Sequence, residues 1–197
     1  MPFLHAIACI IKPFYSFYSR TVRVRIVNRE LSPPGLPPGK NAIYVFWHSK
    51  TFLLLPLFEN PNIGCLTLLD WKNVIYDKLC RLYSYHTVPV ISFRSAGVEL
   101  KSLLDGGFHI ALALDGPKGP AGNLKRGALH LSRTTGKPII PVNVQCEKSF
   151  RLPWRWDRFE IPVPFTAATL SYGEPMQVDD DNLEEIEKKI LAHLKDI

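Results

Sequence analysis

The chain has 197 residues, of which 46% are hydrophobic and 21% charged, a composition that excludes an intrinsically disordered protein and suits one globular domain with a sizeable core. Its four cysteines are scattered with no Cys-x-x-Cys spacing, which argues against a disulfide framework and a zinc site and fits a reducing compartment. The formal net charge is +6, so we expect an anionic partner, either a membrane surface or a phosphorylated substrate; no Lys/Arg block or RNA-binding aromatic motif is present, and we expect no nucleic-acid partner.

The first 18 residues are mostly apolar and end in aromatics, and four arginines follow between positions 20 and 29. His5, Lys12 and Pro13 interrupt the apolar run, which makes it a poor spanning helix. Because the cations follow the apolar part instead of preceding it, the pattern does not favour a signal peptide. Two interpretations stay open: a helix at the membrane interface with its arginines on anionic lipid, or a helix packed on the domain's own core.

Apolar runs alternate with helix-periodic segments through the rest of the chain. Strands are predicted at 43–47, 63–69, 87–93, 109–115, 137–146 and 168–175. Helices are predicted at 51–58, 71–85, 96–107, 125–136 and 182–197. Several strands are apolar throughout, so the pattern predicts an α/β fold: a layered, largely parallel mixed β-sheet flanked by helices. We expect a membrane-associating segment over 1–30 and a single domain over 31–197.

Two polar stretches follow predicted strands, at the edge where parallel sheets build their sites. His48 directly follows the strand at 43–47, and this position separates it from the other five histidines. Histidine is the commonest general base, so His48 is the candidate catalytic residue. No Gly-x-Ser-x-Gly elbow is present, which disfavours a serine hydrolase, and no His/Asp/Glu cluster has the spacing of a metal site.

The second stretch is Asp115-Gly116-Pro117-Lys118-Gly119-Pro120, between a predicted strand and a predicted helix. Its glycines let backbone N–H groups approach a ligand, while Lys118, Lys125 and Arg126 add positive charge near the helix N-terminus. This chemistry suits a phosphate or a developing oxyanion, although the spacing is not that of a Walker A loop. From these residues alone, a proline-stiffened turn with exposed cations fits equally well.

Seven short motifs occur in a characteristic order along residues 20–178. They are FWH (46–48), LLD (68–70), SFRSAG (92–97), ALDGPKGP (113–120), KPIIPV (137–142), WDRFEIPVPF (156–165) and YGEP (172–175). In this order they resemble the lysophospholipid acyltransferase superfamily, which includes the glycerol-phosphate acyltransferases, and most of all its small bacterial branch long known only as a domain of unknown function. DGPKGP and WDRFEIPVPF are the most specific of the seven.

The resemblance implies an acyltransferase-like fold and transfer of a fatty acyl group from an acyl thioester, of coenzyme A or acyl carrier protein, to a hydroxyl of a phosphorylated lipid acceptor. The acceptor would be a lysophospholipid or a lipid A-type sugar. No cofactor beyond the thioester co-substrate and no metal is expected. We expect the chain to lie peripherally on the anionic cytoplasmic face of the inner membrane.

The resemblance also assigns residues. His48 matches the family's base, the Asp115–Lys118 block stands where the superfamily binds the acceptor's phosphate, and Arg94 stands near a second arginine of the same role. The predicted substrate-binding set is Arg94, Asp115, Gly116, Pro117, Lys118, Gly119, Lys125 and Arg126.

One departure concerns the acid that would orient His48. The superfamily's His-x-x-x-x-Asp spacing requires an acid at position 53, where this chain has Leu53. Asp70 is the candidate replacement, because the small branch carries an aspartate at the matching strand end. The Gly-Glu that normally follows is here Trp71-Lys72. Because the acid at position 53 is missing, a non-catalytic lipid-binding protein of the same fold is the alternative.

The aromatic, proline-rich stretch at 153–165 contains Arg155 and Arg158, and Arg151 precedes it. It could wall an acyl groove or touch the bilayer, with its aromatics at headgroup depth. It could equally form a buried irregular connection, because aromatic residues dominate protein cores too.

Overall fold

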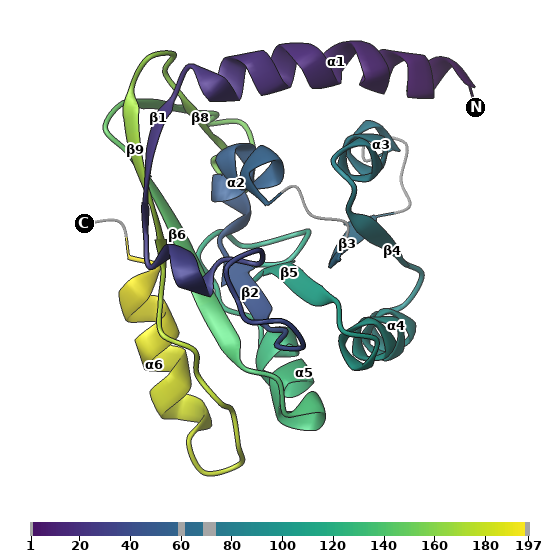
Figure 1. Cartoon of the computed structure of the whole chain (residues 1–197), viewed down its shortest axis with the longest axis vertical. Helices are drawn as coiled ribbons and strands as arrows, with labels where there is room; N and C mark the ends of the chain where they lie inside the picture. The colour runs from purple at the N-terminus through teal and green to yellow at the C-terminus, as the bar shows by residue number, and fades with distance from the viewer. Residues whose placement is uncertain (1, 59–61, 69–73, 196–197) are drawn as a thin grey trace.

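The computed structural model describes residues 2–58, 62–68 and 74–195, which form a seven-stranded sheet between two layers of helices (Figure 1). The strands of this sheet are β1 (Arg23–Val27), β2 (Ile43–Phe46), β3 (Ile63–Leu68), β4 (His86–Val90), β5 (His109–Ala113), β6 (Ile139–Cys146) and β9 (Ala167–Tyr172). The helices are α1 (Pro2–Arg20), α2 (Thr51–Leu57), α3 (Val74–Leu82), α4 (Phe93–Asp105), α5 (Gly127–Thr135) and α6 (Leu183–His193).

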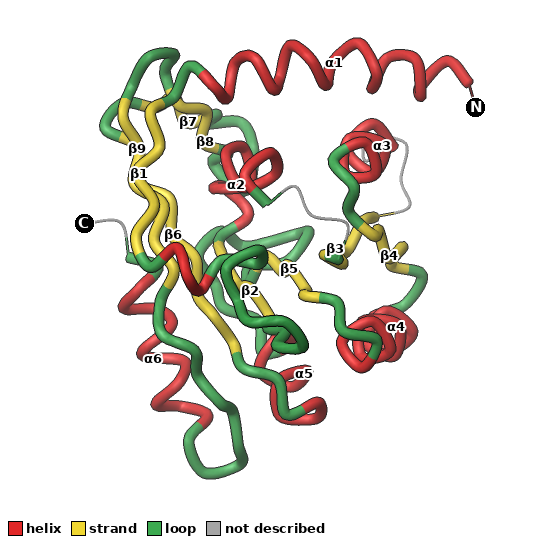
Figure 2. The backbone as a smooth tube through the Cα atoms, viewed as in Figure 1, coloured by secondary structure: helices red, strands yellow, loops and turns green. Residues whose placement is uncertain are grey.

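The sheet runs in the order β1-β9-β6-β2-β5-β3-β4. All neighbours in the β6-to-β4 part pair in parallel, whereas β9 runs antiparallel to β6, and β1 pairs parallel with β9. A separate antiparallel hairpin, β7 (Ser149–Arg151) and β8 (Glu160–Pro162), lies near α2 (Figure 2). The predicted α/β class with a largely parallel mixed sheet is confirmed.

Residues of β2 alternate between two hydrophobic cores, because successive side chains of a strand point to opposite faces. Tyr44 and Phe46 pack with residues of α2 and α3 on one face of the sheet. Ile43 and Val45 pack with residues of α4, α5 and α6 on the other face. The strand is buried on both sides, which explains its uninterrupted apolar sequence. The sheet is therefore covered on both faces.

The N-terminal helix packs on the domain along one face only. The Lys12 ammonium donates to the Leu82 carbonyl at 2.5 Å, and the Tyr15 hydroxyl donates to a carbonyl of α2. Along the opposite face Ile10, Phe14 and Phe17 are 62%, 71% and 73% exposed and follow each other at helical spacing. The helix therefore combines core packing with an exposed apolar stripe. Among the described residues, no helix has the length and apolar character needed to cross a bilayer.

Three strands were not predicted from the sequence. β1 lies among the arginines that follow α1, and its alternating Arg-Val-Arg pattern is that of an edge strand with one exposed face. The β7–β8 hairpin lies in the proline-rich stretch, where Pro162 takes the end of a short strand. That stretch is not a buried connection: Trp154 and Phe165 are 78% and 76% exposed.

Candidate active site

The carboxyl end of β2 carries His48 into a short 3-10 turn, where two hydrogen bonds fix its backbone. Its N–H donates to Oδ1 of Asp115 at 3.0 Å, and its carbonyl accepts from the Thr51 hydroxyl at 2.7 Å. Asp115 follows β5, the parallel neighbour of β2, and is 1% exposed. Burial raises the pKa of this carboxyl, while the amides of His48 and Gly122 oppose the shift. Asp115 thus holds the backbone of His48 in place.

The imidazole of His48 lies against a carboxylate that is 109 residues away in the chain. Its Nδ1 is 2.8 Å from Oδ2 of Asp157, whose side chain is completely buried. Burial by itself raises the pKa of Asp157, but hydrogen bonds from Arg155 and His48 outweigh it and hold the pKa below its ordinary range. An ionised carboxylate only accepts, so Nδ1 of His48 carries the proton and donates it. Nε2 is left with a lone pair, in a side chain that is 28% exposed.

Further donors fix Asp157 itself. Arg155 donates to both carboxylate oxygens, with Nε 2.9 Å from Oδ1 and Nη2 2.8 Å from Oδ2, and the Phe159 amide donates to Oδ1 at 3.2 Å. A carboxylate with so many partners has one orientation, which it imposes on the imidazole. This arrangement is that of a general base whose tautomer is set by a buried acid.

Trp156 and Gly119 bring the two motif-bearing loops together at His48. The Trp156 ring lies 5.3 Å from the His48 ring, centroid to centroid. Gly119 has φ +64°, and a Cβ on it would stand 2.4 Å from Cε3 of Trp156. The loop after β5 can therefore approach this ring only with glycine at 119. DGPKGP and WDRFEIPVPF, the two most specific motifs, form one site.

Lys118 and Lys125, the two lysines of the predicted anion-binding loop, differ in their surroundings. Lys118 is exposed, and the side chain of Lys125 folds over Gly116, where its Nζ lies 3.2 Å from the position of a Cβ. Gly116 has φ +66°, so glycine provides both the turn and the room for Lys125. The loop thus places two lysines beside the carboxyl end of β5. The predicted approach of its glycine amides to a ligand is not seen, because the Gly116 N–H donates to the Ala113 carbonyl at 3.2 Å and Gly119 is buried.

The other predicted site residues lie apart from the His48–Asp157 pair. Arg126 forms an ion pair with Glu187 of α6, with Nε and Oε1 2.6 Å apart. Arg94 is exposed in the first turn of α4, which begins at Phe93 because Ser92 and Ser95 form a capping box; the predicted strand at 87–93 was too long. Asp70 lies outside the described residues.

Sequence reasoning missed Asp157 as the acid on His48. The motif around Asp157 is among the most specific, but its aromatic residues and prolines were the features interpreted, and the acid was expected at the end of a strand, at Asp70. Sequence reasoning also missed a second buried pair: Nζ of Lys50 lies 2.9 Å from Oε2 of Glu160, with both residues about 5% exposed. The available signal was the acidic residue inside each motif, Asp157 and Glu160, in a segment that is otherwise aromatic and basic.

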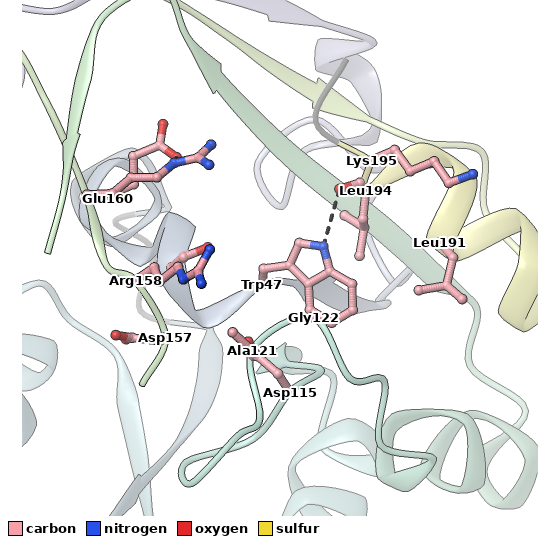
Figure 3. Close-up of a pocket in the computed structure, with 12 residues that line it drawn as sticks. Trp47, Asp115, Ala121, Gly122, Asp157, Arg158, Glu160, Leu191, Leu194 and Lys195 are labelled. Carbon is pink, nitrogen blue, oxygen red and sulfur yellow. Dashed lines mark hydrogen bonds and ion pairs between the residues drawn. The ribbon is translucent and has the colours of Figure 1, made fainter. Parts of the chain in front are cut away.

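A pocket of about 430 Å³ adjoins the His48–Asp157 pair (Figure 3). Its lining residues are Trp47, Ser49, Asp115, Ala121, Gly122, Arg151, Asp157, Arg158, Glu160, Leu191, Leu194 and Lys195. Within the part of the chain that the structure describes, no serine side chain hydrogen-bonds to the His48 ring. Nε2 could therefore activate a nucleophile that a substrate supplies.

Comparison with solved structures identifies the fold. The chain is similar to the 1-acyl-sn-glycerophosphate (LPA) acyltransferase PlsC from Thermotoga maritima, with a TM-score of 0.61 and 17% sequence identity over 95% of this chain and 79% of that one. The chain is also 26% identical over 166 residues to the uncharacterized protein RP090 of Rickettsia prowazekii (strain Madrid E), which covers 79% of this chain and 76% of the relative. No family model matches the sequence. The architecture is therefore acyltransferase-like.

Proposed function

We propose that this chain is a peripheral membrane acyltransferase that moves a fatty acyl group from an acyl thioester to a hydroxyl of a phosphorylated lipid acceptor. The observation that carries the proposal is the 2.8 Å contact between Nδ1 of His48 and the buried carboxylate of Asp157. It leaves a lone pair on Nε2, in a side chain that is 28% exposed and to which no serine of the described residues is hydrogen-bonded. The acyltransferase-like fold supports the same assignment.

The reaction follows from this arrangement. Nε2 of His48 takes the proton of the acceptor hydroxyl while its oxygen attacks the thioester carbonyl. The new C–O bond forms, the C–S bond breaks, and the proton passes from the imidazolium to the departing thiolate. Asp157 stabilises the imidazolium between these two transfers, as the acid of a Ser-His-Asp triad does. The substrate supplies the alcohol, so a serine is not needed.

The loop after β5 supplies the positive charge for the acceptor. Lys118 and Lys125 stand on this loop, so the acceptor's phosphate is proposed to bind there. Arg94 is proposed to assist from the first turn of α4. Arg126 is held by Glu187 and contributes to this site only if that exposed pair opens.

Membrane association is proposed to run through α1. Its exposed stripe of Ile10, Phe14 and Phe17 provides apolar side chains for the lipid interface, and Arg20 and Arg23 follow at its C-terminal end. The Tyr18 hydroxyl donates to the Pro162 carbonyl at 2.8 Å, which ties this end of α1 to the segment that carries the exposed Phe165. The basic residues favour an anionic cytoplasmic leaflet.

The proposal is tested by the consumption of acyl-coenzyme A and of acyl carrier protein thioester with lysophosphatidate in anionic vesicles. We expect turnover by the unaltered chain and a loss of about 10²–10⁴-fold in His48→Ala, because that is the contribution of a general base. His130→Ala, which removes an exposed histidine of α5, is the matched control and should keep full activity. Binding of the vesicles without thioester consumption would instead support a non-catalytic lipid-binding protein.

A further inference from the structure

The pocket beside Asp157 has features that acyl transfer at His48 does not use. Figure 3 shows Arg158 on one side of it, Trp47 and Leu194 on another, and the Ala121–Gly122 turn below them. Arg151, which forms an ion pair with Glu160, also lines the pocket. The Trp47 indole is locked in place because its Nε1 donates to the Leu194 carbonyl at 3.2 Å. The pocket therefore has a cationic wall and a rigid apolar wall, a combination suited to an amphipathic ligand.

Arg158 is the cation of this wall that is not neutralised. It has φ +48°, a left-handed conformation that is costly for a residue with a Cβ and so marks a constrained position. Among the described residues, no carboxylate lies within ion-pair distance of Arg158. An arginine fork at a pocket wall is the protein group best matched to phosphate, which it binds through two parallel hydrogen bonds.

The acids that line the pocket do not oppose an anion, because each is already compensated. Asp157 is bound by Arg155 and His48, and Glu160 is bound by Lys50 at 2.9 Å with Arg151 at 3.4 Å. Burial raises the pKa of Asp115, which disfavours its charged form. The charge left over at this pocket is therefore positive.

We propose that this pocket binds a phosphate ester of a substrate through Arg158, with Arg151 beside it, and packs the neighbouring part of that substrate on Trp47. The cations of this site, Arg158 and Arg151, are distinct from Lys118 and Lys125, although Asp115, Ala121 and Gly122 of the loop after β5 also line the pocket. The inference rests on the proposed function only for the source of the phosphate, which is either the acyl donor coenzyme A or the lipid acceptor. Both carry a phosphate ester next to a less polar chain.

The test is equilibrium binding by titration calorimetry on the full chain carrying His48→Ala, so that no turnover occurs. The probes are coenzyme A and lysophosphatidate, each with a phosphate-free counterpart, pantetheine and monoacylglycerol, in the same detergent. We expect Arg158→Gln to weaken one phosphorylated probe by about tenfold to a hundredfold, as expected for the loss of charge-assisted hydrogen bonds, and to leave its counterpart unchanged. The probe that is weakened identifies the source of the phosphate.

Two further variants keep the test decisive. Arg158→Gly removes the cation while keeping the backbone at φ +48° favourable, so it separates loss of charge from backbone rearrangement. Arg133→Gln, whose arginine pairs with Asp180 on the surface, is the control for a general loss of positive charge. Both Arg158 variants should weaken the same probe, and Arg133→Gln should weaken neither.

The inference is overturned if neither probe binds, if both Arg158 variants bind both probes as Arg133→Gln does, or if the phosphate-free counterparts weaken equally. Its failure is distinct from that of the proposed function. If the unaltered chain consumes thioester but the Arg158 variants bind both probes as tightly as before, the phosphate site is disproved and the proposed reaction stands. If binding depends on the phosphate but no thioester is consumed, the phosphate site is supported and the proposed reaction is disproved.

Discussion

Nδ1 of His48 and Oδ2 of Asp157 lie 2.8 Å apart although 109 residues separate them in the chain. The strand that leads to His48 is central in the sheet, whereas Asp157 lies in the loop between β7 and β8. Their contact therefore depends on how that hairpin is docked, and the buried Lys50–Glu160 pair is part of the docking because it joins the turn after His48 to β8.

Asp157 should make the chain sensitive to acid. Its pKa is lower in the folded chain than in the unfolded one, so the stability it contributes is complete above the unfolded value of about 4 and is lost as the pH falls below it. Asp157→Asn removes this titration and should cost about 2 kcal/mol at pH 7. Urea unfolding of both proteins from pH 6 to pH 3 should show the difference shrinking, and a constant difference would contradict the pKa shift.

Gly119 and Gly122 offer a matched pair of substitutions in one loop. Both have positive φ, so alanine at either should cost about 1–2 kcal/mol through the backbone. At Gly119 the new Cβ also meets Trp156 at 2.4 Å, whereas at Gly122 nothing lies within 4 Å. Gly119→Ala should therefore lose more stability in thermal unfolding and lower turnover as well, since it displaces the ring beside His48. Equal effects of the two substitutions would rule out this contact.

The Lys50–Glu160 pair should respond differently to single and double substitution. Lys50→Met leaves the carboxylate of Glu160 buried, with Arg151 at 3.4 Å as its remaining ion-pair partner among the described residues, and should cost about 3 kcal/mol in chemical denaturation. Adding Glu160→Gln removes that charge and should restore most of the loss. If the double variant is as unstable as the single one, the pair does not behave as a buried ion pair.

The exposed stripe of α1 is expected to mediate vesicle binding. Phe14→Ser with Phe17→Ser should sharply reduce co-sedimentation with anionic vesicles, because it removes two of the three exposed apolar side chains of the stripe. Val98→Ser is the control, since Val98 is 68% exposed on α4, across the sheet from α1. A comparable loss in the control would place the contact elsewhere.

The local sequence pattern was sufficient to predict most of the strands and helices. Apolar strands such as Ile43–Phe46, which is buried at every position, are identifiable from composition alone. β1 was missed because its alternating arginines suit both an edge strand and a lipid-facing segment. The β7–β8 hairpin was missed because short strands with proline carry almost no periodic signal, and only the long-range packing determines them.

Of the two residues of the proposed catalytic pair, only His48 was predictable from the sequence. His48 was placed by the rule that polar residues after parallel strands form sites, and the loop at 115–120 by its glycines. Asp157 follows no such rule: it lies in an irregular segment, and only tertiary contact brings it to the histidine. A carboxylate partner cannot be assigned from spacing when the backbone between the two residues crosses the whole domain.

The most direct test of the account compares Asp157→Asn with Asp70→Asn in acyl transfer from acyl-coenzyme A to lysophosphatidate. Asp70, the acid first expected from the sequence, serves as the internal comparison. Losing the acid that fixes the tautomer of His48 should lower turnover of Asp157→Asn by about 10⁴-fold, the effect of the equivalent change in a catalytic triad, while Asp70→Asn keeps most of its activity. Full activity of Asp157→Asn, with turnover lost in Asp70→Asn, would contradict the account.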